Sequence, residues 1–583
     1  AYAVIVSASV GNGRVRAIDS AEAESLPGVL SVLSHVNAPR LPYLPHKAGI
    51  DPAIGERLHT LQDDEVRHWG QAVALVIAET LEQAEHAAAV VSITYAAERP
   101  VQPLSDGPAN AIAAEDMVEP KGGYPANYTR GDPEAALLRA DVKIDHEYRI
   151  PRENHNPMEP HATVARWEGD RLTVWDKSQW VVNAREELAA IFGLAAENVH
   201  VICPFIGGAF GSCLRVWPHT TLAAMAARHL GRPVKLVLTR KQMYFGTGFR
   251  PDTWQRFRIG AAKDGKLVSV EHEARAETSR YEHFFEGTLN STRFMYSCPD
   301  LTTRYRLVPQ DVHTPNHMRG PGVSSGIFAL ESAMDELAHS LEMDPVELRL
   351  LNEPTIDEGR NVPFSSRSIR ECLRAGAEQF GWHRRSAKPG TQRDGNWLTG
   401  LGMSAATYHT LRSPSSARVR LRADGSAVIE TAASDMGPGT YTSLTQVACD
   451  ALGLPPEKVH VVIGDSDFPR TPAHGGSQTM ASVGSAVFAA CRSARAKHEE
   501  RSKSGSLNRD EIVVTESSQA GDEGKRFAMH AFGAVFAEVR VDVDLGLVRV
   551  VRVVGAYGTG RIVNPRMAHS QAIGGIVGGI GMA

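Results

Sequence analysis

The sequence has 583 residues, of which 42% are hydrophobic and 22% charged, and its formal net charge is −5. This length exceeds one ordinary domain and suggests about three to four. Basic and acidic residues are mixed along the chain, so the charge gives no reason to expect nucleic acid as a partner. The apolar run at 573–583 is too short and too rich in glycine to cross a membrane.

The cysteines stand far apart, and no two form a Cys-x-x-Cys pair. They are Cys203, Cys213, Cys298, Cys372, Cys449 and Cys491. This spacing matches neither an iron–sulfur motif nor a structural zinc site, so we predict buried thiols. No leader segment is visible, and a cytoplasmic or a periplasmic location fits the sequence equally. Ala1 opens directly into a strand-like run and Ala583 lies in a glycine-rich segment, so we expect the natural polypeptide to extend beyond both ends.

In chain order, residues 1–105 are predicted to form an α/β unit. The apolar run 72–78 predicts a strand, the amphipathic spacing of 80–91 a helix, and 92–97 another strand. Proline and glycine in a polar stretch predict a linker at 106–132. A second linker is predicted at 384–398. The charged, serine-rich stretch 497–509 predicts a surface loop.

The sequence contains an internal repeat at a constant offset of 260 residues. Six residues match between the copies: Gly193, Leu194, Glu197, Val199, His200 and Val201 correspond to Gly453, Leu454, Glu457, Val459, His460 and Val461. Each copy reads as a helix, a Gly-Leu turn and a strand, followed by a glycine-rich loop and a second, small-residue helix. A common helix–strand arrangement could also give such a match. We favour two related domains that face one site between them.

The loop at 207–212 follows a predicted strand and precedes a helix. Glycines there let the backbone approach a ligand closely, and N–H groups at a helix start suit an anion. Its spacing is neither that of a dinucleotide-binding fingerprint nor that of a P-loop. Taken alone, the loop could equally be a tight structural turn.

Its companions favour the functional interpretation. They are SQW at 178–180, MRGPG at 318–322, DMGPGTYT at 435–442, GGSQ at 475–478 and SQAIGGIVGGIGMA at 570–583. Together these segments resemble the ordered loops by which molybdenum hydroxylase large subunits of the xanthine dehydrogenase/aldehyde oxidase family hold molybdopterin. The resemblance covers essentially the whole chain and is closest to bacterial aldehyde oxidoreductases with molybdopterin cytosine dinucleotide.

The resemblance implies an α+β fold. It has a hammerhead-like α/β domain at 1–105, followed by two related molybdopterin-binding α/β domains at 133–383 and 399–583. In this family the pterin dithiolene holds the metal, so no protein ligand is expected. The HNPMEPH run at 155–161 is therefore interpreted as structural, and Glu159 and Asp435 likewise.

Residue roles follow from the same resemblance. Gln179 matches the glutamine that bonds to the apical oxo group, and Arg319 matches an arginine beside the pterin. The other predicted cofactor-binding residues match backbone loops: Gly207, Gly208, Phe210, Gly211, Gly437, Gly439, Thr440, Gly475, Gly476, Ser477, Gln478, Ser570, Gln571, Gly574 and Gly578.

Two positions depart from relatives. Leu214 stands where purine-oxidising relatives have a glutamate, which predicts an apolar substrate pocket suited to aldehydes unless Leu214 only packs. The family's general base lies in a Gly-x-Gly-Glu motif that this sequence lacks. No catalytic residue is therefore assigned, and the base is expected beyond Ala583.

The resemblance implies oxidation of aldehydes to carboxylic acids, with water as the oxygen source. Electrons would pass to a small [2Fe–2S] subunit and a medium FAD subunit, with neither nucleic acid nor membrane as a partner. Other possibilities are a hydroxylase of N-heteroaromatic rings, a non-catalytic cofactor-binding paralogue and a generic nucleotide-binding protein. A carbon monoxide dehydrogenase is disfavoured, because no AYRCSFR-like run occurs.

Overall fold

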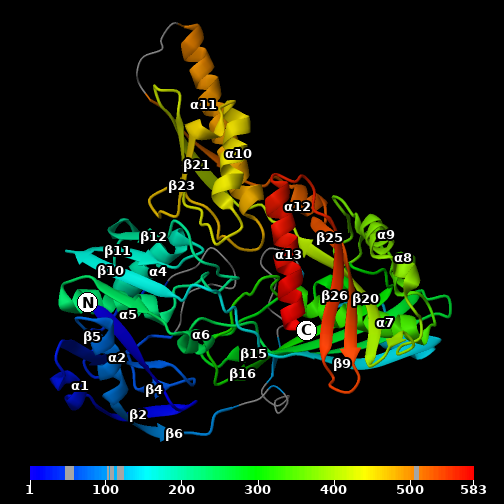
Figure 1. Cartoon of the computed structure of the whole chain (residues 1–583), viewed down its shortest axis with the longest axis horizontal. Helices are drawn as coiled ribbons and strands as arrows, with labels where there is room; N and C mark the ends of the chain where they lie inside the picture. The colour runs from blue at the N-terminus through cyan, green and yellow to red at the C-terminus, as the bar shows by residue number, and fades with distance from the viewer. Residues whose placement is uncertain (46–57, 102–103, 105–110, 114–123, 505–510) are drawn as a thin grey trace.

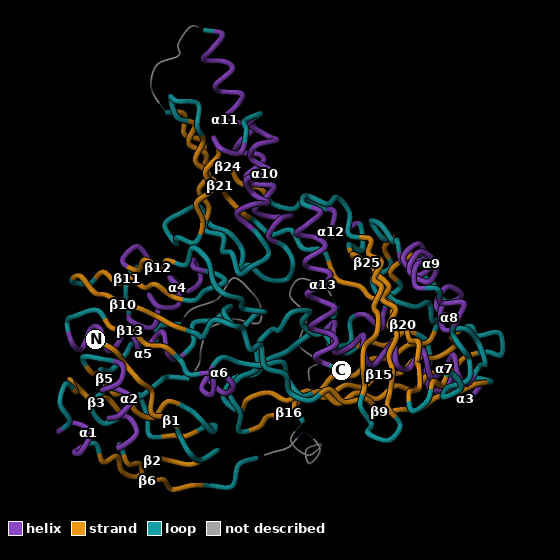
Figure 2. Tube along the Cα trace, viewed as in Figure 1, coloured by secondary structure: helices purple, strands orange, loops and turns teal. Residues whose placement is uncertain are grey.

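Figure 1 shows the computed structural model, which describes residues 1–45, 58–101, 104, 111–113, 124–504 and 511–583. Helices and sheets are mixed throughout, which confirms the α+β fold class. The N-terminal unit lies at the lower left of the view, and the second repeat projects at the top (Figure 2). None of the described helices is both long and apolar enough to cross a membrane.

The N-terminal unit confirms the elements predicted for it. It contains β1 (Tyr2–Ser7), β2 (Gly13–Asp19), α1 (Ala21–Ser25), β3 (Val29–Ser34), β4 (Glu65–Val66), β5 (Ala72–Ala78), α2 (Leu81–Val90) and β6 (Ser92–Ala97). Helix α2 begins after Thr80 because Thr80 and Gln83 form a reciprocal capping box. Strand β1 pairs in parallel with β13 (Val234–Val237) of the first repeat, so one sheet joins the two units.

The internal repeat is visible as two units with the same topology. The first contains β10 (Ala162–Glu168), β11 (Arg171–Asp176), α4 (Val181–Phe192), β12 (Val199–Ile202), α5 (Pro218–Leu230) and β13. The second contains β21 (Ser415–Leu421), β22 (Ala427–Thr431), α10 (Thr440–Leu452), β23 (Val459–Ile463), α11 (Ser485–Lys503) and β24 (Ile512–Ser518). Their strand orders are β12-β11-β10-β13 and β23-β22-β21-β24, with the first pair parallel in each.

Backbone hydrogen bonds join the two repeats directly. Cys203 N donates to Gly464 O at 2.6 Å, and Ser466 N donates to Val201 O at 3.0 Å. The His200 ring contacts Asp465 at 2.8 Å. The glycine-rich loops of the two copies therefore lie at one junction.

Two further sheets build the rest of the molecule. One has the order β7-β16-β15-β14-β9, with β8 on β16, and comprises β7 (Ile112–Ala113), β8 (Tyr128–Arg130), β9 (Val142–Ile150), β14 (Thr253–Ala261), β15 (Leu267–Ser279) and β16 (Asp300–Gln310). The other comprises β19 (Arg393–Asp394), β20 (Trp397–His409), β25 (His530–Asp542) and β26 (Val548–Gly558). Helices α3 (Pro133–Arg139), α7 (Val323–Ser340) and α9 (Ile369–Phe380) pack against these sheets, and α8 (Pro345–Leu351) packs against α7.

The hydrophobic core does not break at the linker predicted at 384–398. Phe380 and Trp382, which precede it, pack against Phe536, which follows it, with ring centroids 5.6 and 5.4 Å away. Most of the linker predicted at 106–132 lies outside the described residues. Its end is ordered as β8 on β16.

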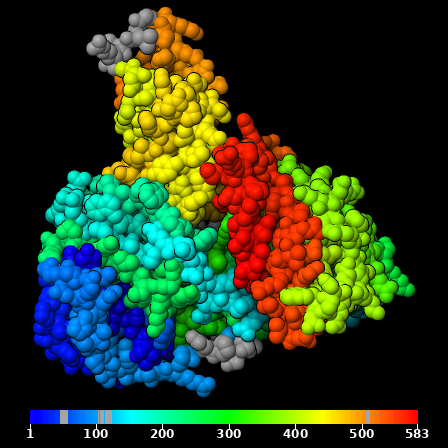
Figure 3. Space-filling view, in the orientation of Figure 1, coloured from blue at the N-terminus to red at the C-terminus, as the bar shows by residue number. Residues whose placement is uncertain are grey.

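Two predictions of loops were wrong. Residues 497–503 continue α11, because lysine, arginine and glutamate favour a helix and Arg495 pairs with Glu499 one turn on. Residues 505–509 of that stretch lie outside the described residues. The segment at 570–583 belongs to helix α13 (Pro565–Met582), which Asn564 caps and Pro565 starts. Figure 3 shows α13 on the surface beside β26.

Candidate cofactor and active site

A cavity of about 700 Å³ lies where loops of the two repeats meet. Most residues predicted to bind the cofactor or substrate line it: Gln179, Phe210, Gly211, Leu214, Arg319, Gly437, Thr440, Gly475, Gly476, Ser477, Gln478 and Gln571. They come from both repeats, from the loop before α7 and from α13. The tertiary structure thus brings together residues up to 392 positions apart in sequence (571 − 179).

The other predicted residues lie outside the lining. Gly207 donates its N–H to Glu159, and Gly208 turns the loop with φ of +88°. Gly439 caps α10 with φ of +85°. Ser570, Gly574 and Gly578 lie on α13. At Gly574 a Cβ would come within 3.1 Å of the Arg319 guanidinium, so this glycine makes room for Arg319.

Gln179 is 2% exposed and connects the glycine-rich loops of the two repeats. Its Oε1 accepts hydrogen bonds from the backbone N–H groups of Gly211 and Cys213, at 3.2 Å each. Its Nε2 donates to His474 O at 2.7 Å. An amide nitrogen carries two hydrogens, so the second remains available to an acceptor in the cavity.

The loop backbones adopt conformations that a ligand site explains. Phe210 and Ser477 both line the cavity and have φ of +57° and +54°, values that non-glycine residues rarely adopt. Gly211 has φ of +113°, and a Cβ there would lie 1.9 Å from His317 O. Only glycine therefore lets this loop pass the 317–321 loop.

One side of the cavity suits an anion. Burial lowers the pKa of Arg319, whose Nη2 donates to Gln571 O at 2.8 Å. Among the described residues, no carboxylate forms a salt bridge with Arg319. Helix α10 begins at Thr440 without a side-chain cap, and its N-terminus faces this cavity. Of the N–H groups in its first turn, that of Tyr441 donates to Asp435 Oδ2 at 3.4 Å. A guanidinium and a helix N-terminus are groups that proteins use to hold phosphate.

The structure adds lining residues that the sequence analysis missed. They are Ala209, Phe285, Glu286, Gly287, His317, Met318, Gly320, Pro321, Tyr408, His409, Leu411, Met436, Pro438, Ser443, His474, Thr479 and Met480. Several lie inside the motifs at 207–212, 318–322 and 435–442 without having been singled out, and others adjoin a motif. The segments 285–287 and 408–411 carry no comparable signal. Glu286 Oε2 accepts from Gly322 N at 2.9 Å and so supports the start of α7.

The HNPMEPH segment packs behind the 207–212 loop. His155 contacts His317 O at 2.8 Å, and His161 contacts Ser212 Oγ at 3.1 Å. Burial lowers the pKa of His155 to about 4, so its ring is neutral at pH 7. Asp435 accepts from Gly437 N at 2.9 Å. The side chains of His155, His161 and Asp435 therefore form hydrogen bonds with the loops around the cavity.

Comparison with known proteins identifies the domains that contain the cavity. A molybdopterin cofactor-binding domain matches residues 117–353, and a second such domain matches 375–519 and 501–583. The aldehyde oxidase and xanthine dehydrogenase a/b hammerhead domain matches 1–99. The chain belongs to the xanthine dehydrogenase/aldehyde oxidase family of molybdenum hydroxylases. The cavity therefore lies within the molybdopterin-binding domains of an oxidoreductase.

Relatives in this family cover the whole chain. The aldehyde oxidoreductase molybdenum-binding subunit PaoC of Escherichia coli K12 is 36% identical over 606 residues, which cover 100% of this chain and 80% of PaoC. An aldehyde oxidoreductase of Megalodesulfovibrio gigas is 28% identical, covering 100% and 67%. The solved structure of the aldehyde oxidoreductase from Desulfovibrio gigas superposes with a TM-score of 0.85 at 26% identity, again covering 100% and 67%.

The residues present fit molybdopterin. The Gln179 amide offers a donor, Arg319 and the α10 N-terminus suit phosphate, and the glycines allow close backbone approach. The apolar side chains Phe210, Leu214 and Met436 complete a pocket of the size that a cofactor needs.

Proposed function

We propose that this chain oxidises aldehydes to carboxylic acids as the large subunit of a molybdenum hydroxylase. The observation that carries the proposal is Leu214. It lines the cavity next to Gly475, where a Cβ would lie 3.3 Å from Leu214 Cδ2, and it stands where purine-oxidising relatives have a carboxylate. An apolar wall favours an uncharged aldehyde over a purine. Two relatives bear the name aldehyde oxidoreductase.

The cofactor form we propose is molybdopterin cytosine dinucleotide. A dinucleotide has two phosphates, a sugar and a base to hold, and the lining includes separate backbone loops at 435–440 and 475–478 for them. Arg319 and the N-terminus of α10 would bind the phosphates. Gln179 would donate from Nε2 to an oxygen near the metal. When bound, the cofactor supplies a Lewis-acidic metal that activates water and accepts two electrons.

The chain's own residues would orient the substrate and exclude water. Leu214 and Phe210 form an apolar wall beside Gln179. The carbonyl group of a substrate would therefore enter a site of low polarity, where hydrogen bonds to the carbonyl oxygen are strong. Among the described lining residues, Glu286 is the carboxylate, and it already accepts from Gly322 N. We assign Glu286 a structural role and no proton transfer.

We propose that electrons leave to partner subunits that carry [2Fe–2S] and FAD. The cysteines of this chain are free, and the potential metal ligands that cluster in the described residues are His200, Asp465 and Asp467, with no cysteine. An iron–sulfur cluster needs cysteine thiolates close together. Copurification of the native chain with polypeptides that bear iron, sulfide and flavin is the expected result.

A substrate panel on the molybdenum-loaded native complex tests the activity. We expect kcat/KM for benzaldehyde to exceed that for nicotinate, quinoline and xanthine. Leu214→Glu should lower kcat/KM for benzaldehyde by at least about tenfold, because it buries a charge in the wall. Leu214→Met conserves volume and polarity and is the matched control. Faster turnover of the rings would establish the N-heteroaromatic alternative. A complex that is fully loaded with molybdenum cofactor but turns over none of these substrates would establish the non-catalytic paralogue.

A further inference from the structure

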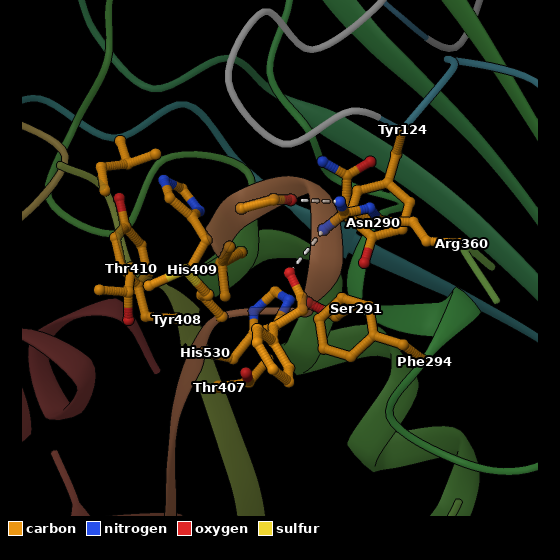
Figure 4. A pocket seen from close by; sticks show the side chains of 15 residues that line it. Tyr124, Asn290, Ser291, Phe294, Arg360, Thr407, Tyr408, His409, Thr410 and His530 are labelled. Carbon is orange, nitrogen blue, oxygen red and sulfur yellow. Dashed lines mark hydrogen bonds between the residues drawn. The ribbon is translucent and has the colours of Figure 1, made fainter. Parts of the chain in front are cut away.

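A second, smaller pocket of about 80 Å³ lies beside the cofactor cavity. The two share Tyr408, His409 and Leu411 as lining residues. Side chains reach it from the segment at 290–294, from the end of β20, from the start of β25, and from Tyr124 and Arg360 (Figure 4). The volume holds a few water molecules or a ligand of a few heavy atoms.

His530 is a buried polar residue that lines this pocket. It is the first residue of β25, pairs in register with His409 of β20, and is 8% exposed. Its ring packs on Phe294 with centroids 4.2 Å apart. Its Nδ1 is buried and has no hydrogen-bond partner among the described residues. An unsatisfied buried polar atom is costly, and a group bound in the pocket would supply the partner that this nitrogen lacks.

The electrostatic surroundings of the pocket are positive. Arg360 lines it and donates from Nη2 to Gly524 O at 2.6 Å and from Nη1 to Phe527 O at 3.4 Å (Figure 4). A guanidinium has five N–H donors, so these two bonds do not exhaust it. Burial, and then the nearby charges of His409, Arg360 and Arg367, lower the pKa of His530 to about 3.

No described lining residue carries a carboxylate. Asp357, a carboxylate close to Arg360, is engaged elsewhere. It accepts from the Tyr124 hydroxyl, and its Oδ1 accepts from Gly359 N at 2.9 Å and from Arg360 N at 3.1 Å. The hydroxyl group of Ser291 adds a neutral donor to the pocket wall, whereas that of Thr407 donates to Ala531 O at 3.1 Å.

We propose that this pocket binds a small oxyanion, held by the Arg360 guanidinium and a hydrogen bond from the His530 imidazole. The shared chemistry is that of a carboxylate or of inorganic phosphate, each small enough for the volume. Planar guanidinium forks suit both. The inference rests on the pocket alone and is independent of the reaction proposed above.

Calorimetric titration of the cofactor-loaded native protein with formate and with inorganic phosphate tests the proposal. We expect saturable binding of at least one of them. His530→Phe keeps the ring packing on Phe294 but removes both nitrogens, and Arg360→Gln removes the charge. Each should weaken binding by about tenfold or more. Arg526→Gln removes an exposed charge that is paired with Asp522 outside the lining, so it should change affinity less than about twofold.

The two oxyanions distinguish the source of the ligand. Binding of formate alone would indicate a carboxylate site, and binding of phosphate an inorganic oxyanion site. Crystals of the native protein soaked in selenate give a second measurement that does not depend on the folding of Arg360→Gln. An anomalous selenium peak between Arg360 and His530 would support an oxyanion site. Absence of saturable binding by both ions, or unchanged affinity in a folded His530→Phe variant, would overturn the proposal. Formate binding without aldehyde turnover would leave this site standing while the proposed reaction fails.

Discussion

Gln179 shows what one residue contributes at this site. Its motif, SQW, predicted a cofactor ligand by resemblance, and that role stays a prediction. The structure adds that the same side chain bonds to Gly211, Cys213 and His474. It therefore positions both glycine-rich loops before any cofactor binds.

Removing these bonds should destabilise the fold as well as the site. Gln179→Ala leaves two N–H groups and one carbonyl without their partner, so the free energy of unfolding should fall by about 1–3 kcal/mol. Gln179→Glu keeps the acceptor for Gly211 and Cys213 but turns a buried carboxylate oxygen towards His474 O, so its free energy of unfolding should fall as well. Denaturant unfolding and bound molybdenum measure the two effects. Gln379→Ala, at an exposed amide on α9, is the control and should stay within about 0.5 kcal/mol. Equal stability of Gln179→Ala and the native chain would contradict this role.

At the scale of elements, both repeats stop their first helix in the same way. Helix α4 ends at Gly193 with φ of +66°, and α10 ends at Gly453 with φ of +71°. A left-handed residue at this position favours glycine. The glycine of the Gly-Leu pair thus ends the helix in each repeat. This shared role explains why the pair occurs at the same position in both copies.

The two glycines should nevertheless differ in their tolerance of alanine. Gly453→Ala should cost about 1 kcal/mol, because only backbone strain opposes it and the nearest atom lies 3.5 Å from the added Cβ. Gly193→Ala should cost more, since its Cβ would come 2.9 Å from Pro42 Cγ. Urea unfolding of the two variants measures the difference. Gly402→Ala, in open space at ordinary φ on β20, is the control. A larger loss for Gly453→Ala than for Gly193→Ala would refute the argument.

At the scale of the whole molecule, packing of the units leaves several histidines buried and neutral. Burial is the main cause that lowers the pKa of His68 and His155 to about 4 and of His219 and His530 to about 3. Burial also raises the pKa of Asp176 to about 6. The histidines lie in the N-terminal unit, the first repeat and the β20–β25 sheet. Protonation of the histidines at low pH would therefore destabilise all of these parts of the molecule.

The pH dependence of stability follows from these directions. Between their folded pKa and about 6.5, the four histidines bind fewer protons in the folded state than in the unfolded state. Their contribution is present above pH 6.5 and is lost as the pH falls. Asp176 acts oppositely, since its neutral form stabilises the fold at low pH and that gain is lost as the pH rises through 6. With four groups against one, Tm should fall between pH 7 and pH 5.

Thermal unfolding at pH 7, 6 and 5 checks this expectation. Each histidine lowers the free energy of unfolding by up to about 1.4 kcal/mol for each pH unit between its folded pKa and its unfolded pKa. His530→Phe removes one of the four and should show a smaller loss of Tm over the same interval. A Tm that is constant or rises towards pH 5 would be inconsistent with buried neutral histidines.

The sequence alone determined the repeat, the strands and helix at 72–97 and the glycine-rich loops. These features depend on local backbone preference and on periodicity, which neighbouring residues encode. The tertiary structure alone decided which loops meet, since Gln179 and His474 are 295 residues apart. It also decided that the core crosses the predicted linker and that 570–582 is helical.

The small pocket with His530 is also a feature that only the tertiary structure decided. It forms where separate parts of the chain converge: Tyr124, 290–294, Val323, Arg360, 407–411 and 524–530. No motif marks Arg360 in the sequence. Burial and missing partners are properties of the packed chain. A cavity depends on the summed positions of distant side chains, so local sequence patterns carry no record of it.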